Sequence, residues 1–301
     1  MENILIIKTN ATGDVLRTTV LLHILKGKIF WITAAYNIPI FPDNQPDLIL
    51  VPAEDIHADI LNLKFDLVIN LEEDIQLAQL VNRIDSKKKI GVYWNNGKLD
   101  YSDDSAEWFD MSLISRFSAS QADELKIKNK FSYQDIICRM IGKKFSGQSY
   151  ILYTNKFNET DDHTIIGIEE RVGSRWPNKY WNGYGELKQQ LRKNKYEVLV
   201  FEQRPKLRQY MDDIRQCSVI LTGDTLAMHI ALGYKIPCIA IFNCTSPIEI
   251  YDYGILQKIT SPILEKVFYN TTLLKSATEA ISVGIVLEKI YAQLRQHAEK
   301  P

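Results

Sequence analysis

Short apolar runs alternate along the whole chain with stretches whose apolar residues recur at helical spacing. Each run is apolar at nearly every position, which is typical of strands in a parallel sheet that is covered on both faces. Strands and helices that alternate in this way predict an α/β fold. The predicted strands are residues 3–8, 29–34, 47–51, 65–71 and 89–94 in the first half, and 164–170, 196–202, 218–224, 237–242 and 256–261 in the second.

Helical patterns fill the intervals between these strands. Residues 97–125 show no clear period and are predicted to be irregular, and a polar stretch within 144–163 is the predicted linker. We therefore expect two doubly wound, Rossmann-like parallel-sheet domains, with a ligand at the strand carboxyl ends that face the cleft between them. The predicted helices are 14–26, 75–84 and 131–143, then 181–193, 205–215 and 225–232, and one amphipathic helix over the last 20 or so residues.

Composition and charge exclude several classes of function. A length of 301 residues fits about two domains, and a net charge of −1 favours neither nucleic acid nor an anionic membrane as partner. No apolar stretch approaches the roughly 18 residues of a membrane span, so we expect at most peripheral membrane contact. The four cysteines lack metal-ligand spacing and are expected to be reduced core residues. With no recognisable signal peptide, these features predict a cytoplasmic protein.

The first polar strand end is the stretch KTNATGDVLRT, where the first predicted strand ends at Lys8. Gly13 permits a tight backbone there, and Asp14 falls in the first turn of the next helix. One interpretation is that Thr12 and Asp14 cap this helix, because free N–H groups at a helix start stabilise a carboxylate. The other is that Asp14 is a general base within reach of an acceptor hydroxyl. The loop is neither a Walker A nor a GxGxxG motif.

The second half of the sequence contains a similar polar strand end. A buried strand ends in Gly223, Asp224 and Thr225, and a helix follows. Thr225 and the first N–H groups of that helix form an anion site that suits a phosphate. His229 lies about one turn further on the same face. It is either a ligand contact or a structural hydrogen-bonding residue.

A third feature is the loop RVGSRWPNKYWNGYGEL, residues 171–187, which contains Arg171, Arg175 and Lys179 beside two tryptophans. One interpretation is aromatic packing with solvated charges. The other is a phosphate clamp, since Lys179 together with helix-start amides can neutralise a diphosphate without a metal ion. No carboxylate cluster suited to a metal is evident in the sequence near these strand ends.

Together the three stretches resemble the family 9 glycosyltransferases, typified by the ADP-heptose:lipopolysaccharide heptosyltransferases. ILIIKTNATGDVLRTTVLL is similar to their N-terminal signature, and WPNKYW to their loop with a lysine and an aromatic residue. TGDTLAMHIALGYKIPCIAIF is similar to their segment with Asp, Thr or Ser, Gly and a later His. In this chain Leu226 stands where that family has the glycine.

The resemblance implies a GT-B fold. It implies an N-terminal acceptor domain (1–155), a nucleotide-sugar donor domain (156–276) and a C-terminal helix (277–301) that packs back on the first domain. It also implies inverting, metal-independent transfer of a sugar, expected to be a heptose from an ADP-linked donor, without a cofactor. The acceptor hydroxyl would belong to a glycan, a lipopolysaccharide core or a small molecule.

The resemblance also implies roles for individual residues. Asp14 would be the catalytic base. The loop on the acceptor side would comprise Lys8, Thr9, Thr12, Gly13 and Arg17. The donor would be held by Ser174, Arg175, Lys179, Glu202, Asp224, Thr225, Leu226, Ala227 and His229.

The charge balance bears on the acceptor and leaves alternatives open. Residues 1–150 contain 17 Lys and Arg against 20 Asp and Glu, which favours an acceptor less anionic than a phosphorylated lipid. The lysine runs at 86–89 and 126–130 could form a local basic patch or be solvated faces. Two other functions fit the sequence. One is a catalytically silent nucleotide-sugar-binding protein. The other is a GT-B epimerase, for which Glu72, Glu73 and Asp74 would have to supply a second acid.

Overall fold

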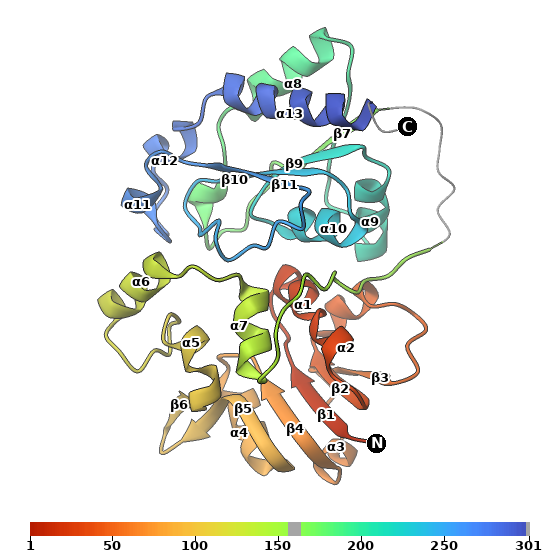
Figure 1. Cartoon of the computed structure of the whole chain (residues 1–301), viewed down its shortest axis with the longest axis vertical. Coiled ribbons are helices and arrows are strands. Elements are labelled where there is room, and N and C mark those ends of the chain that lie inside the picture. The colour runs from red at the N-terminus through yellow and green to blue at the C-terminus, as the bar shows by residue number, and fades with distance from the viewer. Residues whose placement is uncertain (156–163, 299–301) are drawn as a thin grey trace. The chain divides into compact units, whose positions relative to one another are not determined.

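The computed structural model describes residues 1–155 and 164–298 of the chain. The chain divides into two compact units, Met1–Tyr153 and Thr154–Pro301, each built around its own sheet (Figure 1). Part of the predicted linker (156–163) and the end of the predicted terminal helix (299–301) lie outside the described residues.

The first unit contains a six-stranded sheet in the order β3-β2-β1-β4-β5-β6. Five strands run parallel, and β6 runs antiparallel to β5. The strand order reverses between β1 and β4, where parallel α/β sheets usually bind ligands at their carboxyl edge. The strands are β1 (Asn3–Ile7), β2 (Lys28–Thr33), β3 (Leu48–Pro52), β4 (Lys64–Asn70), β5 (Asp85–Asn95) and β6 (Lys98–Tyr101).

Helices of this first unit differ from the prediction in two places. The single helix expected over 14–26 is two short helices, α1 and α2. The stretch 97–125, expected to be irregular, contains β6 and three helical segments. The helical segments are α1 (Thr12–Thr18), α2 (Leu21–Ile24), η1 (Ala35–Ile40), α3 (Ala58–Leu61), α4 (Ile75–Arg83), η2 (Asp103–Ser105), α5 (Ala106–Phe109), α6 (Ala119–Lys128) and α7 (Tyr133–Met140).

The hairpin between β5 and β6 accounts for the strand within 97–125. It turns at Asn96 and Gly97, whose φ angles are +46° and +88°. A two-residue turn with positive φ at both positions matches the twist of the flanking strands, and Asn-Gly is the dipeptide that adopts it most readily. The prediction of irregular structure was therefore wrong here, although the sequence carries the turn signal.

Apolar side chains from the neighbouring strands β3, β2, β1 and β4 form a core of the first unit. Phe30 of β2 and Phe65 of β4 meet edge to face, with ring centroids 5.5 Å apart. Leu5, Ile7 and Val68 are fully buried in the same cluster. This packing fixes the neighbouring strands β1 and β4, and so the position of the loops that follow them.

In the second unit, the described residues form a five-stranded, wholly parallel sheet in the order β11-β10-β9-β7-β8. Its order reverses between β7 and β9. The strands are β7 (Ile165–Ile168), β8 (Glu197–Val200), β9 (Val219–Gly223), β10 (Cys238–Phe242) and β11 (Leu256–Thr260). The helical segments are η3 (Pro177–Lys179), α8 (Tyr184–Lys193), α9 (Leu207–Arg215), α10 (Leu226–Tyr234), α11 (Leu264–Val267), α12 (Lys275–Glu279) and α13 (Val283–Ala298).

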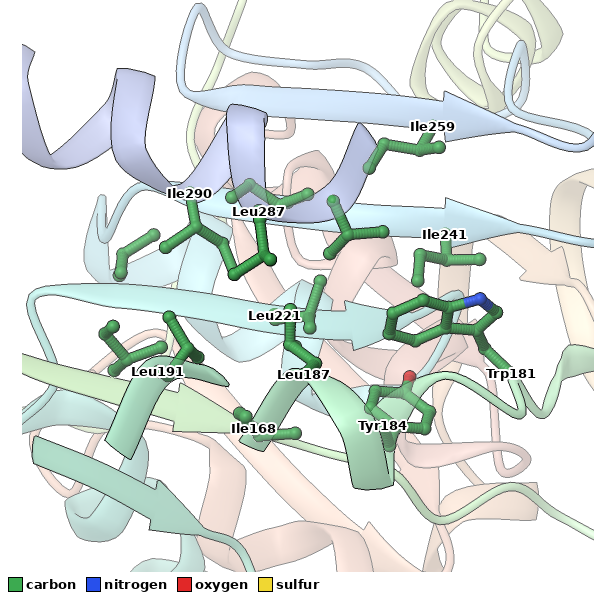
Figure 2. Close-up of a cluster of buried hydrophobic side chains, with 14 of the residues drawn as sticks. Ile168, Trp181, Tyr184, Leu187, Leu191, Leu221, Ile241, Ile259, Leu287 and Ile290 are labelled. Carbon is green, nitrogen blue, oxygen red and sulfur yellow. The ribbon is translucent and has the colours of Figure 1, made fainter. Parts of the chain in front are cut away.

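Figure 2 shows the core on one face of this second sheet. Leu187 of α8 and Leu287 of α13 are buried together with Leu221 of β9. Trp181 packs edge to face on Tyr184, with ring centroids 5.1 Å apart. The helices α8 and α13 therefore cover the same face of the sheet.

The C-terminal segment, predicted as one helix, is two helices with a break after Glu279. The carbonyl of Ile281 accepts a hydrogen bond from Trp181 Nε1 at 2.9 Å, whereas in a helix interior it would bind an N–H of its own segment. Beyond the break, the buried Val286, Leu287 and Ile290 join the core of the second unit. Packing of residues 277–301 on the first domain stays a prediction.

The four cysteines are buried and free, as expected for core residues. Burial raises the pKa of the Cys138 and Cys217 thiols to about 12, so neither is a thiolate at neutral pH. Among the described helices, none combines the length and apolar character that a membrane span requires.

Candidate active site

A buried ion pair joins the two strand ends at the point where the first sheet reverses its order. Lys8 follows β1 and Glu72 follows β4, and their Nζ and Oε1 atoms lie 2.9 Å apart. Glu72 Oε1 also accepts the backbone N–H groups of Thr9 at 2.6 Å and Asn10 at 2.9 Å. The Glu72 carboxylate therefore fixes the start of the loop that leads to α1.

Thr9 contributes to this loop through its backbone. Its side chain is buried, and its carbonyl accepts a hydrogen bond from Asn37 Nδ2 at 2.7 Å. Asn37, in η1, is itself fully buried. The loop after β1 is thus held from two sides before it reaches Asp14.

Asp14 lies in the first turn of α1, with a side chain that is 39% exposed. The residue at the N-cap is Ala11, and Thr12 is already helical. The interpretation of Thr12 as the helix cap is therefore wrong. The tight backbone expected at Gly13 is wrong as well, because Gly13 lies within the helix. Asp14 is accessible to solvent at the carboxyl edge of the sheet, as a general base must be.

Arg17 orients the Asp14 carboxylate from one turn further along α1. Its Nη2 atom lies 2.8 Å from Asp14 Oδ1. The Arg17 guanidinium is in turn stacked 3.9 Å from the ring centre of Tyr133 and 5.7 Å from that of Trp108. The Tyr133 hydroxyl lies 2.8 Å from Thr18 Oγ1. Aromatic residues from α5 and α7 therefore fix the arginine that contacts Asp14.

The charged side chains around Asp14 interact electrostatically. Burial opposes the charge of Lys8, but the carboxylates of Asp14 and Glu72 outweigh burial and raise the pKa of the Lys8 ammonium. Lys8 is therefore positively charged over the whole physiological range. Asp14 thus has two cations nearby, Lys8 and Arg17, which compensate its charge.

A second ion pair lies at the carboxyl end of β9 in the second unit. Lys179 Nζ donates to Asp224 Oδ2 at 2.8 Å and to the Asp224 carbonyl at 2.7 Å. Burial opposes the charge of Asp224, but Lys179 and His229 outweigh burial and lower the pKa of Asp224 to about 2. His229 is buried, at 5% exposure. The structure thus brings together Lys179, Asp224 and His229, which the sequence proposed for one site.

Thr225 begins helix α10. It is the N-cap residue, and its Oγ1 accepts the N–H of Ala227 at 3.2 Å. The same Oγ1 lies 2.8 Å from Thr222 Oγ1. Leu226 is the first helical residue and is half-buried. The Thr225 hydroxyl therefore satisfies one of the N–H groups that the sequence assigned to a phosphate.

The basic residues of the 171–187 loop take separate positions. Arg171 forms a two-point ion pair with Glu169, at 2.9 Å from Nε to Oε1 and 2.6 Å from Nη2 to Oε2. Glu169, which follows β7 and is buried, also accepts a hydrogen bond from the Tyr210 hydroxyl at 2.6 Å. Arg171 thus anchors the loop to its own strand, and a role of this loop as a phosphate clamp stays a prediction.

Three further residues proposed for the donor are exposed. Ser174 and Arg175 lie in the turn before η3, and Glu202 lies two residues beyond β8. The Arg175 guanidinium is 5.2 Å from the ring centre of Trp176. The structure gives these three side chains no position in the Lys179–Asp224 cluster, and their contact with a donor stays a prediction.

Sequence reasoning assigned no role in the acceptor loop to Glu72, Trp108 or Tyr133. Glu72 carried a signal, since it directly follows a predicted buried strand. Trp108 lies in the stretch predicted to be irregular. Tyr133 lies 115 residues from its partner Thr18, so no local pattern connects the two.

Comparisons with known proteins bear on the fold. No protein-family model matches the sequence, and no curated protein matches it. The chain is similar to the solved E. coli ADP-heptose lps heptosyltransferase II, at 15% identity over 99% of this chain and 100% of that one, with a TM-score of 0.62.

Two other solved structures are also similar to this chain over nearly its whole length. One is the glycosyl transferase family 9 from Veillonella parvula, at 16% identity over 98% and 97% of the two chains, with a TM-score of 0.61. Another is E. coli heptosyltransferase WaaC with ADP-2-deoxy-2-fluoro heptose, at 16% identity over 96% and 99%, with a TM-score of 0.53. The chain therefore has the GT-B fold of two parallel-sheet α/β units that these glycosyltransferases share.

Proposed function

We propose that this chain is an inverting glycosyltransferase of the family 9 type, which moves a sugar from a nucleoside diphosphate to an acceptor hydroxyl. One observation carries the proposal. Each unit of the GT-B fold has an ion pair at the carboxyl edge of its sheet, at or beside the reversal of strand order. The pair is the buried Lys8–Glu72 in the first unit and the half-buried Lys179–Asp224 in the second. Substrates of α/β sheets bind at such edges.

We assign the donor to the second unit. An ammonium carries three N–H donors, of which Asp224 takes two, and we assign the third to a phosphate oxygen of the donor. The remaining N–H groups at the start of α10 add the positive end of a helix. An ADP-linked heptose is the proposed donor, since two of the three similar structures are heptosyltransferases and one of these two holds an ADP-heptose derivative.

We assign the acceptor to the first unit, beside Asp14. In a single displacement, Asp14 takes the proton of the acceptor hydroxyl. The oxygen of that hydroxyl attacks the anomeric carbon from the face opposite the diphosphate. The new C–O bond forms as the bond to the diphosphate breaks. Lys179 and the start of α10 stabilise the charge that develops on the leaving group, so we expect no metal requirement. The acceptor is a glycan, a lipopolysaccharide core or a small molecule.

The epimerase alternative requires a second acid from the Glu72–Asp74 segment. Glu72 accepts three hydrogen bonds through one oxygen, and Asp74 Oδ1 caps α4 by accepting the Leu77 N–H at 2.9 Å. Glu72 and Asp74 therefore serve the local fold, which leaves Glu73 alone among the three as a source of the second acid and weakens the epimerase alternative. A silent binding protein would retain the donor site without turnover.

The test combines a binding screen with a product assay. Thermal unfolding is followed with ADP, UDP, GDP and their sugars, because a ligand that binds only the folded chain raises the melting temperature. Mass spectrometry then detects an added sugar on candidate glycosides. Stabilisation by an ADP-linked sugar together with a glycosylated product supports the proposal. Stabilisation without any product, for every acceptor tried, would favour the silent binding protein.

A further inference from the structure

A cavity of about 920 Å³ opens within the first unit at the carboxyl edge of its sheet. Its size is that of a pocket for a small molecule or for one or two sugar rings. Its walls come from the loops after β1, β2 and β3 and from helices α3 and α4. Residues that define it are Thr9, Asn10, Tyr36, Glu54, Asp74 and Leu77.

This cavity shares a wall with the loop that carries Asp14. The backbone N–H groups of Thr9 and Asn10 are held by Glu72, and the Asn10 side chain accepts a hydrogen bond from the Tyr36 hydroxyl at 2.7 Å. Asn10 lies four residues before Asp14 in the chain. A group bound in the cavity therefore rests against the acceptor loop.

Two of the three charged side chains lining the cavity are acidic, and both are fixed by backbone hydrogen bonds. Glu54 Oε2 accepts the N–H of Ala35 at 3.0 Å, and Asp74 Oδ1 accepts that of Leu77. The third is the exposed Arg83 of α4. Glu54 and Asp74 thus give the rim an excess of negative charge, and each retains acceptor capacity for a hydroxyl.

The remaining lining combines uncharged polar side chains, such as Gln76 and Gln79, with apolar ones. Ile56, Leu61, Leu77 and Leu80 line the cavity and are half-buried. Such side chains pack against the C–H faces of a sugar ring, while carboxylates at the rim accept hydrogen bonds from its hydroxyls. A phosphate group at the same place would meet two carboxylates of like charge against the single guanidinium of Arg83.

We propose that this cavity holds the acceptor sugar and selects a neutral or amino sugar over a phosphorylated one. The proposal rests on the function proposed above and deepens it, because it names the acceptor class. Glu54 and Asp74 determine the selection by repelling an anionic group. A phosphorylated lipopolysaccharide core is then excluded as the acceptor.

The experiment uses methyl-labelled protein and three probes without any donor: methyl β-D-glucoside, its 2-amino-2-deoxy analogue and its 6-phosphate. We expect the first two to shift the methyl signals of Ile56, Leu61, Leu77 and Leu80. Affinity for the 6-phosphate should be lower by roughly fivefold to tenfold at low salt. Equal or tighter binding of the 6-phosphate, or no shift at these four residues with any probe, overturns the proposal.

A double variant, Glu54→Gln with Asp74→Asn, should remove most of the discrimination. Asparagine retains the capping ability of Asp74, so α4 should stay intact, which unchanged thermal unfolding would confirm. The matched control, Asp47→Asn with Asp59→Asn, removes two exposed carboxylates that do not line the cavity and should keep the discrimination. If the control loses as much discrimination as the Glu54 and Asp74 variant, net charge rather than this pocket is responsible.

The absence of donor separates this test from that of the function. Binding of the neutral glycosides in this cavity, without donor binding in the thermal screen, would support the acceptor cavity and contradict the proposed transferase function. Donor binding without any binding of the neutral glycosides in the cavity would support the transferase function and contradict this acceptor class.

Discussion

The ammonium of Lys8 lies 2.9 Å from the carboxylate of Glu72, across the point where the first sheet reverses its strand order. Both side chains are nearly buried, at 10% and 9% exposure. The same Glu72 oxygen binds the N–H groups of Thr9 and Asn10. One carboxylate thus compensates a buried cation and positions the loop that precedes Asp14.

Glu72→Gln should lower the free energy of unfolding of the first unit by about 3 kcal/mol, because it leaves Lys8 buried with one carboxylate fewer. Denaturant titration measures this change. The control is Asp85→Asn, which breaks the exposed pair of Lys64 and Asp85, whose side chains are 88% and 65% exposed, and should change little. Equal effects of the two substitutions would show that the buried pair has no special role.

Asp224 should make the second unit sensitive to acid. Its pKa is about 2 in the folded chain against an ordinary 3.8, so the stabilisation from its charge is present above pH 3.8 and is lost as the pH falls towards 2. The difference in stability between wild type and Asp224→Asn should therefore shrink by about 2 kcal/mol over that interval. Unfolding at a series of pH values measures it. A difference that stays constant with pH would contradict the ion pair with Lys179.

Lys179→Ala should weaken ADP binding by roughly tenfold to a hundredfold, since a hydrogen bond from a charged group contributes about 1.5–3 kcal/mol. Isothermal titration calorimetry gives both dissociation constants. Lys193→Ala removes the same charge from an exposed position at the end of α8 and should leave ADP affinity unchanged. If the two variants bind ADP equally well, the diphosphate does not contact Lys179.

The sheets could be predicted from the sequence because their strands are apolar on both faces. Strand β9 illustrates this, since all residues of Val219–Gly223 are buried, and its predicted range differed by one residue at each end. The polar Asp224 and Thr225 at its carboxyl end then marked a candidate site. Strand β6 was missed because it has only four residues, although the alternation of Leu99 and Tyr101 with polar residues and the Asn96–Gly97 turn both indicate it.

Much of the candidate site depends on contacts between distant parts of the chain, which periodicity does not encode. The aromatic rings that hold Arg17 come from Trp108 and Tyr133, more than 90 residues further along. The pairing of Arg171 with Glu169 is local, but the sequence could not reveal it either, because residue types alone do not show whether a charge pairs within the chain or binds a ligand. Residue types at strand ends therefore locate a site, but only the tertiary structure shows which charges are already paired.

The most direct measurement of the central claim is the transfer rate of Asp14→Asn, compared with wild type using a donor and an acceptor identified by the screens above. Asp14→Asn should bind the donor with nearly unchanged affinity and lose kcat by about 10²–10⁴, the range expected for removal of a general base. Near-wild-type transfer by Asp14→Asn would contradict the assignment of Asp14 as the base and the mechanism built on it.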